Sequence, residues 1–188
     1  MLTTVAVMLG WALFIYAMIT RPRTQAAPEA SRDLKSRIAI VVQAVGFGAI
    51  WGLRRPAGTM LFSAQRIAAV LLFLVASVLA INSAFFALRA FRHLGKNWSI
   101  VARILESHAL ITTGPYAVVR HPIYSSMFGL LIATGIALSR WQALVAGTVV
   151  CGLGTAWRIR IEERLLKQRF GEEYMQYARR VPAIIPWI

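Results

Sequence analysis

The chain has 188 residues, 58% of them hydrophobic, and a mean hydropathy of +0.61, which is too apolar for an ordinary soluble domain and indicates a membrane protein. Its formal net charge of +14 comes from 21 Lys and Arg residues against 7 Asp and Glu residues. Because these basic residues lie between apolar blocks, they fit loops facing an anionic leaflet better than a nucleic-acid surface. The single cysteine, Cys151, excludes a disulfide framework and a cysteine-cluster metal site.

Five apolar segments are long enough to be membrane helices. They are residues 2–20, 38–53, 67–88, 123–139 and 141–157. The first segment has no basic residues before it and no small-residue cleavage site after it, so we expect a retained span rather than a signal peptide. A single residue, Arg140, separates the last two segments, which predicts an antiparallel helical hairpin. The sequence therefore predicts an all-α integral membrane protein with about five transmembrane helices.

The basic residues between these segments orient the chain. Residues 21–37, 89–122 and 158–188 contain five, five and seven Lys and Arg residues, whereas the two remaining connections contain four between them. With five spans, the three basic segments share one side, and the positive-inside rule makes that side the cytoplasm. We predict an outside N-terminus and a cytoplasmic C-terminal tail, and we assign the chain to a bacterial or archaeal inner membrane.

The first dense motif, residues 114–127 (GPYAVVRHPIYSSM), lies against the start of the fourth span. Its Gly-Pro pair predicts a turn, which Thr113 can cap. His121 precedes Pro122, and this order favours a helix start, so we expect His121 at the mouth of the span beside unpaired backbone N–H groups. Such a position favours an anionic group, for example a carboxylate. Taken singly, His121 or Tyr124 is equally compatible with a side chain at the membrane interface.

The second motif, residues 162–186 (EERLLKQRFGEEYMQYARRVPAIIP), follows the fifth span. Arg158 and Glu162 are four residues apart and can pair on one helix face, either as an ordinary surface ion pair or as part of a site. Arg160 and Arg164 are expected to extend toward lipid headgroups. The glycine after Phe170 predicts a helix C-cap, and a further helix should follow it, either as a lid or wall over a bound molecule or as a simple docking element.

The two motifs, separated by one helical hairpin, resemble the isoprenylcysteine carboxyl methyltransferase family. This family belongs to a wider group of integral-membrane methyltransferases that includes the phospholipid N-methyltransferases. The resemblance covers about residues 94–188, and it divides the chain into a three-span N-terminal region, 1–93, and a catalytic region, 94–188. It implies S-adenosylmethionine as the cofactor, S-adenosylhomocysteine as its product, and a C-terminal cytoplasmic helical region that binds them.

The resemblance also implies individual roles. The implied cofactor-binding residues are His108, Ala109, Leu110, Ile111, Tyr116, His121, Pro122, Ile123, Tyr124 and Glu162. Arg158 is implied to meet the acceptor, and Arg158 and Glu162 are the implied catalytic pair. Such a set suits a zwitterionic, cationic ligand, because the helix mouth and His121 attract its carboxylate, Glu162 attracts its ammonium, and aromatic faces suit its sulfonium or adenine.

The implied reaction is carboxyl O-methylation of a lipophilic acceptor, a small molecule or a prenylated cysteine; phospholipid N-methylation and thiol S-methylation stay open. A carboxylate acceptor needs no general base, which favours an acid or a thiol over an amine. A sterol-type membrane reductase that uses NADPH shares an Arg-His-Pro/Asn-like stretch but lacks the second motif. A non-catalytic scaffold or small transporter would predict charges inside the spans, which the sequence lacks. Asn82 and Ser83 either bond to neighbouring helices or line an acceptor route. The expected partners are the acceptor and membrane lipids, without nucleic acid, and the sequence does not predict an oligomeric state.

Overall fold

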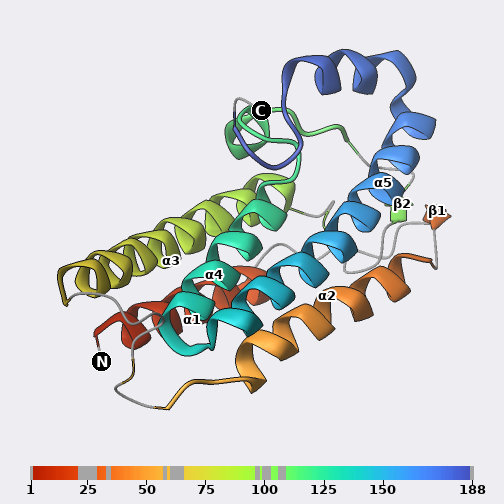
Figure 1. Ribbon diagram of the computed structural model, residues 1–188. Coiled ribbons are helices and arrows are strands. Elements are labelled where there is room, and N and C mark those ends of the chain that lie inside the picture. Colours follow the sequence, from red (N-terminus) through yellow and green to blue (C-terminus); the bar gives the residue numbers. More distant parts are fainter. Residues whose placement is uncertain are drawn as a thin grey trace.

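Five α-helices dominate the computed structural model, which describes residues 2–20, 29–32, 35–56, 59, 66–95, 98, 103–105 and 109–186 (Figure 1). The helices are α1 (Leu2–Thr20), α2 (Lys35–Gly52), α3 (Arg66–Leu94), α4 (Pro122–Leu138) and α5 (Trp141–Arg180). The five predicted spans fall on these five helices. By length and composition, α1, α3 and α5 are long and apolar enough to cross a membrane, whereas α4 is a shorter apolar helix of 17 residues. The chain is an integral multi-pass membrane protein with a helical fold.

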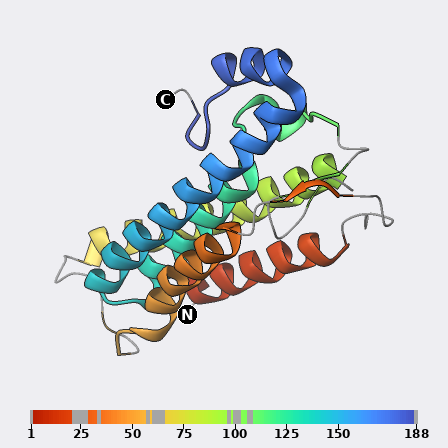
Figure 2. The same ribbon diagram turned by 90° about the vertical axis from the view of Figure 1, so that its right-hand side faces the viewer.

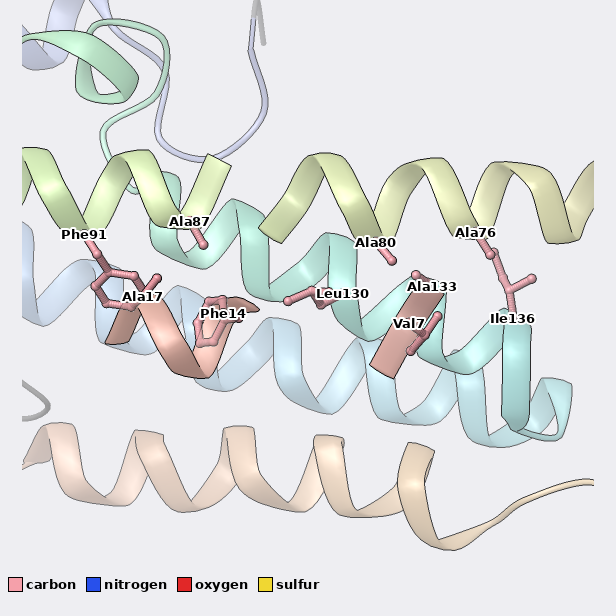
Figure 3. Packing of buried hydrophobic residues seen from close by; sticks show 10 residues of the cluster. All are labelled: Val7, Phe14, Ala17, Ala76, Ala80, Ala87, Phe91, Leu130, Ala133 and Ile136. Carbon is pink, nitrogen blue, oxygen red and sulfur yellow. The ribbon is translucent and has the colours of Figure 1, made fainter. Parts of the chain in front are cut away.

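One apolar core joins α1, α3 and α4 (Figure 3). It is formed by Val7, Phe14, Ala17, Ala76, Ala80, Ala87, Phe91, Leu130, Ala133 and Ile136. The alanines of α3 allow close approach of neighbouring helices, and Phe14 meets Phe91 edge to face with 5.5 Å between ring centroids. Large apolar side chains such as Leu74 and Val78 point outward instead. This inside-small, outside-large distribution suits helices that pack in lipid.

The second packing interface joins α2 to α5 through small residues. A Cβ atom added to Gly46 would lie 2.7 Å from the backbone N of Cys151, so the two helices touch there. The predicted close packing is confirmed at Gly46, but Gly48 faces open space. Gln43 Nε2 donates to Thr155 Oγ1 over 2.7 Å, which satisfies both buried polar groups within the interface. Cys151 is a buried, free cysteine.

The connections separate cleanly to the two ends of the bundle. The α1–α2 and α3–α4 connections meet in a short antiparallel pair, β1 (Glu29–Arg32) with β2 (Arg103–Leu105), which the sequence did not predict. The C-terminal half of α5 lies at this same end (Figure 1). At the opposite end, Arg54 pairs with Ser139, which joins the α2–α3 connection to the α4–α5 turn. The structure therefore gathers the three basic segments on one side, as predicted.

Helix α5 bends sharply at Gly171, whose φ of +52° lies in the left-handed region that glycine tolerates. Beyond this residue the helix folds back over the end of the bundle (Figure 2). The predicted helix stop and new helix at this glycine are confirmed, with Arg179 and Arg180 in the last turn of the second part.

Candidate active site

The site begins at a glycine turn that ends the α3–α4 connection. The short 3₁₀ helix η2 (Gly114–Ala117) starts at Gly114, whose φ is +61°. A Cβ atom there would collide with the ring of His93 from α3, so both backbone conformation and space require glycine. Thr113 occupies the predicted capping position, but its side chain makes no capping hydrogen bond. Tyr116 is buried, and burial followed by the charge of Glu162 raises its pKa.

His121 is the residue that precedes α4, and Pro122 begins the helix, as predicted. The imidazole is buried, and it stacks on Tyr124 with 5.8 Å between ring centroids. The backbone N–H groups of Arg120 and His121 donate to Pro182 and Ala183 over 2.8 and 2.9 Å. The start of α4 is therefore tied to the C-terminal end of the chain.

Glu162 lies at the centre of a cluster that joins α4 to α5. Its Oε1 accepts hydrogen bonds from the Tyr124 hydroxyl and from Arg158 Nη2, the latter over 3.0 Å. Its Oε2 lies 3.7 Å from His121 Nδ1. The Arg158 guanidinium lies over the Tyr124 ring, 5.4 Å from its centroid, and the Arg158 residue is only 8% exposed. Such burial excludes the ordinary surface ion pair that the spacing alone allowed.

Glu163 forms a second, adjacent network. Its Oε1 accepts from Arg120 Nε and Nη2 over 2.9 and 2.8 Å, and it lies 3.2 Å from His121 Nε2. Desolvation alone would raise the pKa of Glu163, but the hydrogen bonds and charges of His121 and Arg120 outweigh it and lower the pKa to about 2. His121 is thus held between two carboxylates. No role was predicted for Arg120 or Glu163, because a pairing across 43 residues leaves no local pattern.

The C-terminal strap, residues 181–184, runs along the start of α4. Arg120 Nη1 donates to the carbonyl oxygens of Ala178, over 2.9 Å, and of Val181. Ser125 Oγ donates to the carbonyl of Ile184 over 2.6 Å. Further along, Tyr177 donates its hydroxyl hydrogen to the carbonyl of Tyr116 over 2.6 Å. Two charged-group contacts and several backbone carbonyls therefore fix the last part of the chain against the first motif.

The structure thus brings together most of the predicted site residues. Tyr116, His121, Tyr124, Arg158 and Glu162 form one buried or half-buried group. The remaining predicted residues are placed differently, as follows.

Ile123 packs against the core of α1, α3 and α4, and Pro122 is buried at the helix start. Ala109 is exposed, whereas Leu110 and Ile111 are half-buried in an irregular segment that leads to the glycine turn. His108 lies outside the described residues. Within the part of the chain that the structure describes, no group of three His, Cys, Asp or Glu side chains could hold a metal ion.

The chemistry of this group fits a zwitterionic ligand. Two partly exposed carboxylates, Glu162 and Glu163, can attract an ammonium, while Arg158 and the imidazole of His121 can attract a carboxylate. Aromatic rings at Tyr116 and Tyr124 lie at the same site. A site with both charges and aromatic faces can bind the amino-acid end of S-adenosylmethionine beside the membrane.

Comparison with known proteins identifies the family. The family model described as phospholipid methyltransferase matches residues 64–173, more than half of the chain. The chain belongs to the phospholipid methyltransferase family. Within this family, its resemblance to the isoprenylcysteine carboxyl methyltransferases is confirmed by its relatives.

Two sequence relatives and one solved structure define that similarity. The chain is 39% identical over 100 residues to protein-S-isoprenylcysteine O-methyltransferase B of Arabidopsis thaliana, covering 53% of this chain and 48% of that protein. It is 36% identical over 91 residues to the Homo sapiens protein-S-isoprenylcysteine O-methyltransferase, covering 44% and 29% respectively. The similarity thus spans at most about half of these relatives.

The eukaryotic intramembrane Ras methyltransferase, isoprenylcysteine carboxyl methyltransferase, superposes with a TM-score of 0.57 at 24% identity. The superposition covers 84% of this chain and 54% of that chain. This member of the phospholipid methyltransferase family therefore shares the fold of that enzyme, including regions outside the sequence match.

Proposed function

We propose that the protein is an S-adenosylmethionine-dependent integral-membrane methyltransferase, and that it methylates the carboxylate of a lipophilic, isoprenylcysteine-like acceptor. The observation that carries this proposal is the buried Arg158–Glu162–Tyr124–His121 cluster at the mouth of α4. It lies in a member of a methyltransferase family, where two helices of the bundle leave the apolar region.

S-adenosylmethionine, when bound, supplies a methyl group on a sulfonium, and the protein's task is to align the acceptor with it in a dry site. Glu162 is the proposed partner of the ammonium, and His121 the proposed partner of the carboxylate. Tyr116 and Tyr124 offer aromatic faces, and residues 108–111 are proposed to contribute backbone groups. Pro122 and Ile123 contribute by starting α4 and anchoring it in the core, so that His121 and Tyr124 keep their positions.

Arg158 is the proposed acceptor-binding residue. Its guanidinium can hold a carboxylate, which is already nucleophilic and needs no general base. Because Arg158 also pairs with Glu162 at 3.0 Å, part of its charge is already balanced. This sharing keeps the acceptor from being bound so tightly that its nucleophilicity falls. The arrangement places acceptor and cofactor on opposite sides of one ion pair.

The proposed topology has five spans, an outside N-terminus and a cytoplasmic site in the inner membrane of a bacterium or archaeon. The gathering of the basic segments 21–37, 89–122 and 158–188 at the site end supports this orientation. Residues 1–93 are proposed as a membrane-anchoring region and residues 94–188 as the catalytic region. Fixation of the C-terminal strap by Arg120 and Ser125 supports a wall over the cofactor rather than a loosely docked tail.

Phospholipid N-methylation is a second candidate, because the matching family model is described as phospholipid methyltransferase. The test supplies the detergent-purified full chain with tritiated S-adenosylmethionine and, in parallel, N-acetyl-S-farnesylcysteine, phosphatidylethanolamine or a long-chain thiol. We expect base-labile label, released as methanol, with the farnesylcysteine. Stable label in phosphatidylethanolamine or in the thiol would instead assign N- or S-methylation.

The matched variants are Arg158→Gln, at the site, and Arg179→Gln, at an exposed position. Loss of a charged group that contacts the acceptor typically reduces the rate 10²-fold or more, so about that loss is expected for Arg158→Gln only. Binding of NADPH without binding of S-adenosylhomocysteine would overturn the proposal in favour of a reductase.

A further inference from the structure

One face of α5 changes character where the helix leaves the apolar region. Val145, Val149, Leu153 and Trp157 are spaced by four residues, and all are exposed. The same face continues with Arg160, Arg164 and Lys167, which are also exposed. Spacings of three and four keep side chains on one side of a helix. We call these three residues the basic stripe.

The basic stripe lies away from the active site. The opposite side of α5 packs on α2 through Gly147, Cys151 and Gly154, and it carries the buried Arg158. Glu162 and Glu163, the nearest carboxylates in the sequence, bind site residues instead. Within the described residues, no acidic side chain forms an ion pair with any member of the stripe. Three positive charges therefore stand together without a protein counter-charge.

The stripe also lies at the depth of lipid headgroups. Trp157, an amphipathic side chain typical of the membrane interface, marks the end of the apolar face. At a rise of about 1.5 Å per residue, Arg160 follows about 5 Å beyond it, Arg164 about 10 Å and Lys167 about 15 Å. The polar region of one leaflet is about 5–8 Å thick, so Arg160 lies within it and Arg164 reaches it with its long side chain. Lys167 stays within about one Debye length.

We propose that the basic stripe, Arg160, Arg164 and Lys167, binds the phosphate groups of anionic phospholipids in the leaflet on the active-site side. The lipid-facing apolar surface of α5 runs directly into the stripe, so a lipid whose acyl chains lie along Val149 and Leu153 presents its headgroup to these charges. This inference does not depend on the identity of the reaction. It requires only that the apolar face of α5 contacts lipid.

The test measures lipid selectivity directly and needs no catalytic activity. The full chain is reconstituted in phosphatidylcholine vesicles that contain a trace of spin-labelled phosphatidylglycerol or spin-labelled phosphatidylcholine. The motionally restricted fraction of each label gives the relative association constant. A basic side chain near an anionic surface contributes about 1 kcal/mol, which is about fivefold in association. We expect phosphatidylglycerol to be preferred about fivefold, and the preference to fall toward one in about 1 M salt.

The variant Arg160→Gln/Arg164→Gln/Lys167→Gln should lose most of this preference. Its matched control, Arg37→Gln/Arg89→Gln/Arg92→Gln, removes the same charge from exposed positions at the same end of the bundle on α2 and α3. This control should keep the preference. Equal losses in both triple variants would show only a diffuse effect of net charge and would overturn the stripe, as would a stripe variant that keeps the full preference. Circular dichroism of both variants verifies the helical fold.

Discussion

Replacing Glu163 by Gln should release the end of the chain from the first motif. Glu163 accepts two hydrogen bonds from Arg120 and lies 3.2 Å from His121. A lowering of its pKa from 4.5 to about 2 corresponds to about 3 kcal/mol of stabilisation. Because the side chain is 27% exposed, solvent screens part of this energy. We therefore expect Glu163→Gln to lower the free energy of unfolding by about 2 kcal/mol, in the range of hydrogen bonds to charged groups.

The assay is equilibrium unfolding in mixed dodecyl maltoside and dodecyl sulfate micelles, followed by circular dichroism. Glu172→Gln is the matched control, because Glu172 pairs with Arg179 at 3.8 Å and both side chains are more than 60% exposed. This control should change stability by less than about 1 kcal/mol. Hydrogen exchange should also become faster at the backbone N–H groups of Arg120 and His121 in Glu163→Gln only. Equal stability of the two variants, with unchanged exchange, would refute the reasoning.

Three further predictions concern the same contacts and the helix packing. The pKa of Glu163 is lowered on folding, so the stability difference between wild type and Glu163→Gln should be full above about pH 4.5 and vanish as the pH falls toward 2, as measured by the same unfolding assay. Tyr177→Phe leaves the buried carbonyl of Tyr116 without its hydroxyl donor and should cost about 1–2 kcal/mol; an unaltered unfolding midpoint would count against this hydrogen bond. Gly46→Ala forces a Cβ to within 2.7 Å of the α5 backbone and should cost about 1–3 kcal/mol, whereas Gly48→Ala, which faces open space, should be neutral or stabilising because alanine favours helix; the opposite order of stability would contradict the packing.

The sequence predicted the helices well because their signals are local. Long apolar runs place the five helices, and the Gly-Pro turn and the proline after His121 predict the start of α4. The pairing of Arg158 with Glu162 also follows from a spacing of four residues. Gly171 predicts the bend in α5, because a left-handed residue is needed there.

The missed features depend on contacts between distant segments. The β1–β2 pair joins two polar connections with no alternating apolar pattern, so nothing in either strand predicts it. The Arg120–Glu163 pair and the Tyr177–Tyr116 hydrogen bond arise only after α5 folds back at its bend. Asn82 shows the same limit in reverse: it is exposed, and it bonds to the carbonyl of Val78 in its own helix.

Ser83, its neighbour, is buried against Gly129 of α4. The predicted interhelical contact therefore occurs at the second residue of the pair only. Periodicity places a residue on a helix, but which side then faces a partner is decided by the packing of the whole bundle.

The most direct test of the proposed site is calorimetric titration of the detergent-purified chain with S-adenosylhomocysteine. We predict binding in the micromolar range, as is common for enzyme substrates. Binding should be lost or strongly weakened in Glu162→Gln and in His121→Ala, and kept in Glu172→Gln. Folded wild-type protein that does not bind S-adenosylhomocysteine, or Glu162→Gln and His121→Ala variants that bind it as tightly as wild type, would contradict the proposal that this cluster is a methyltransferase active site.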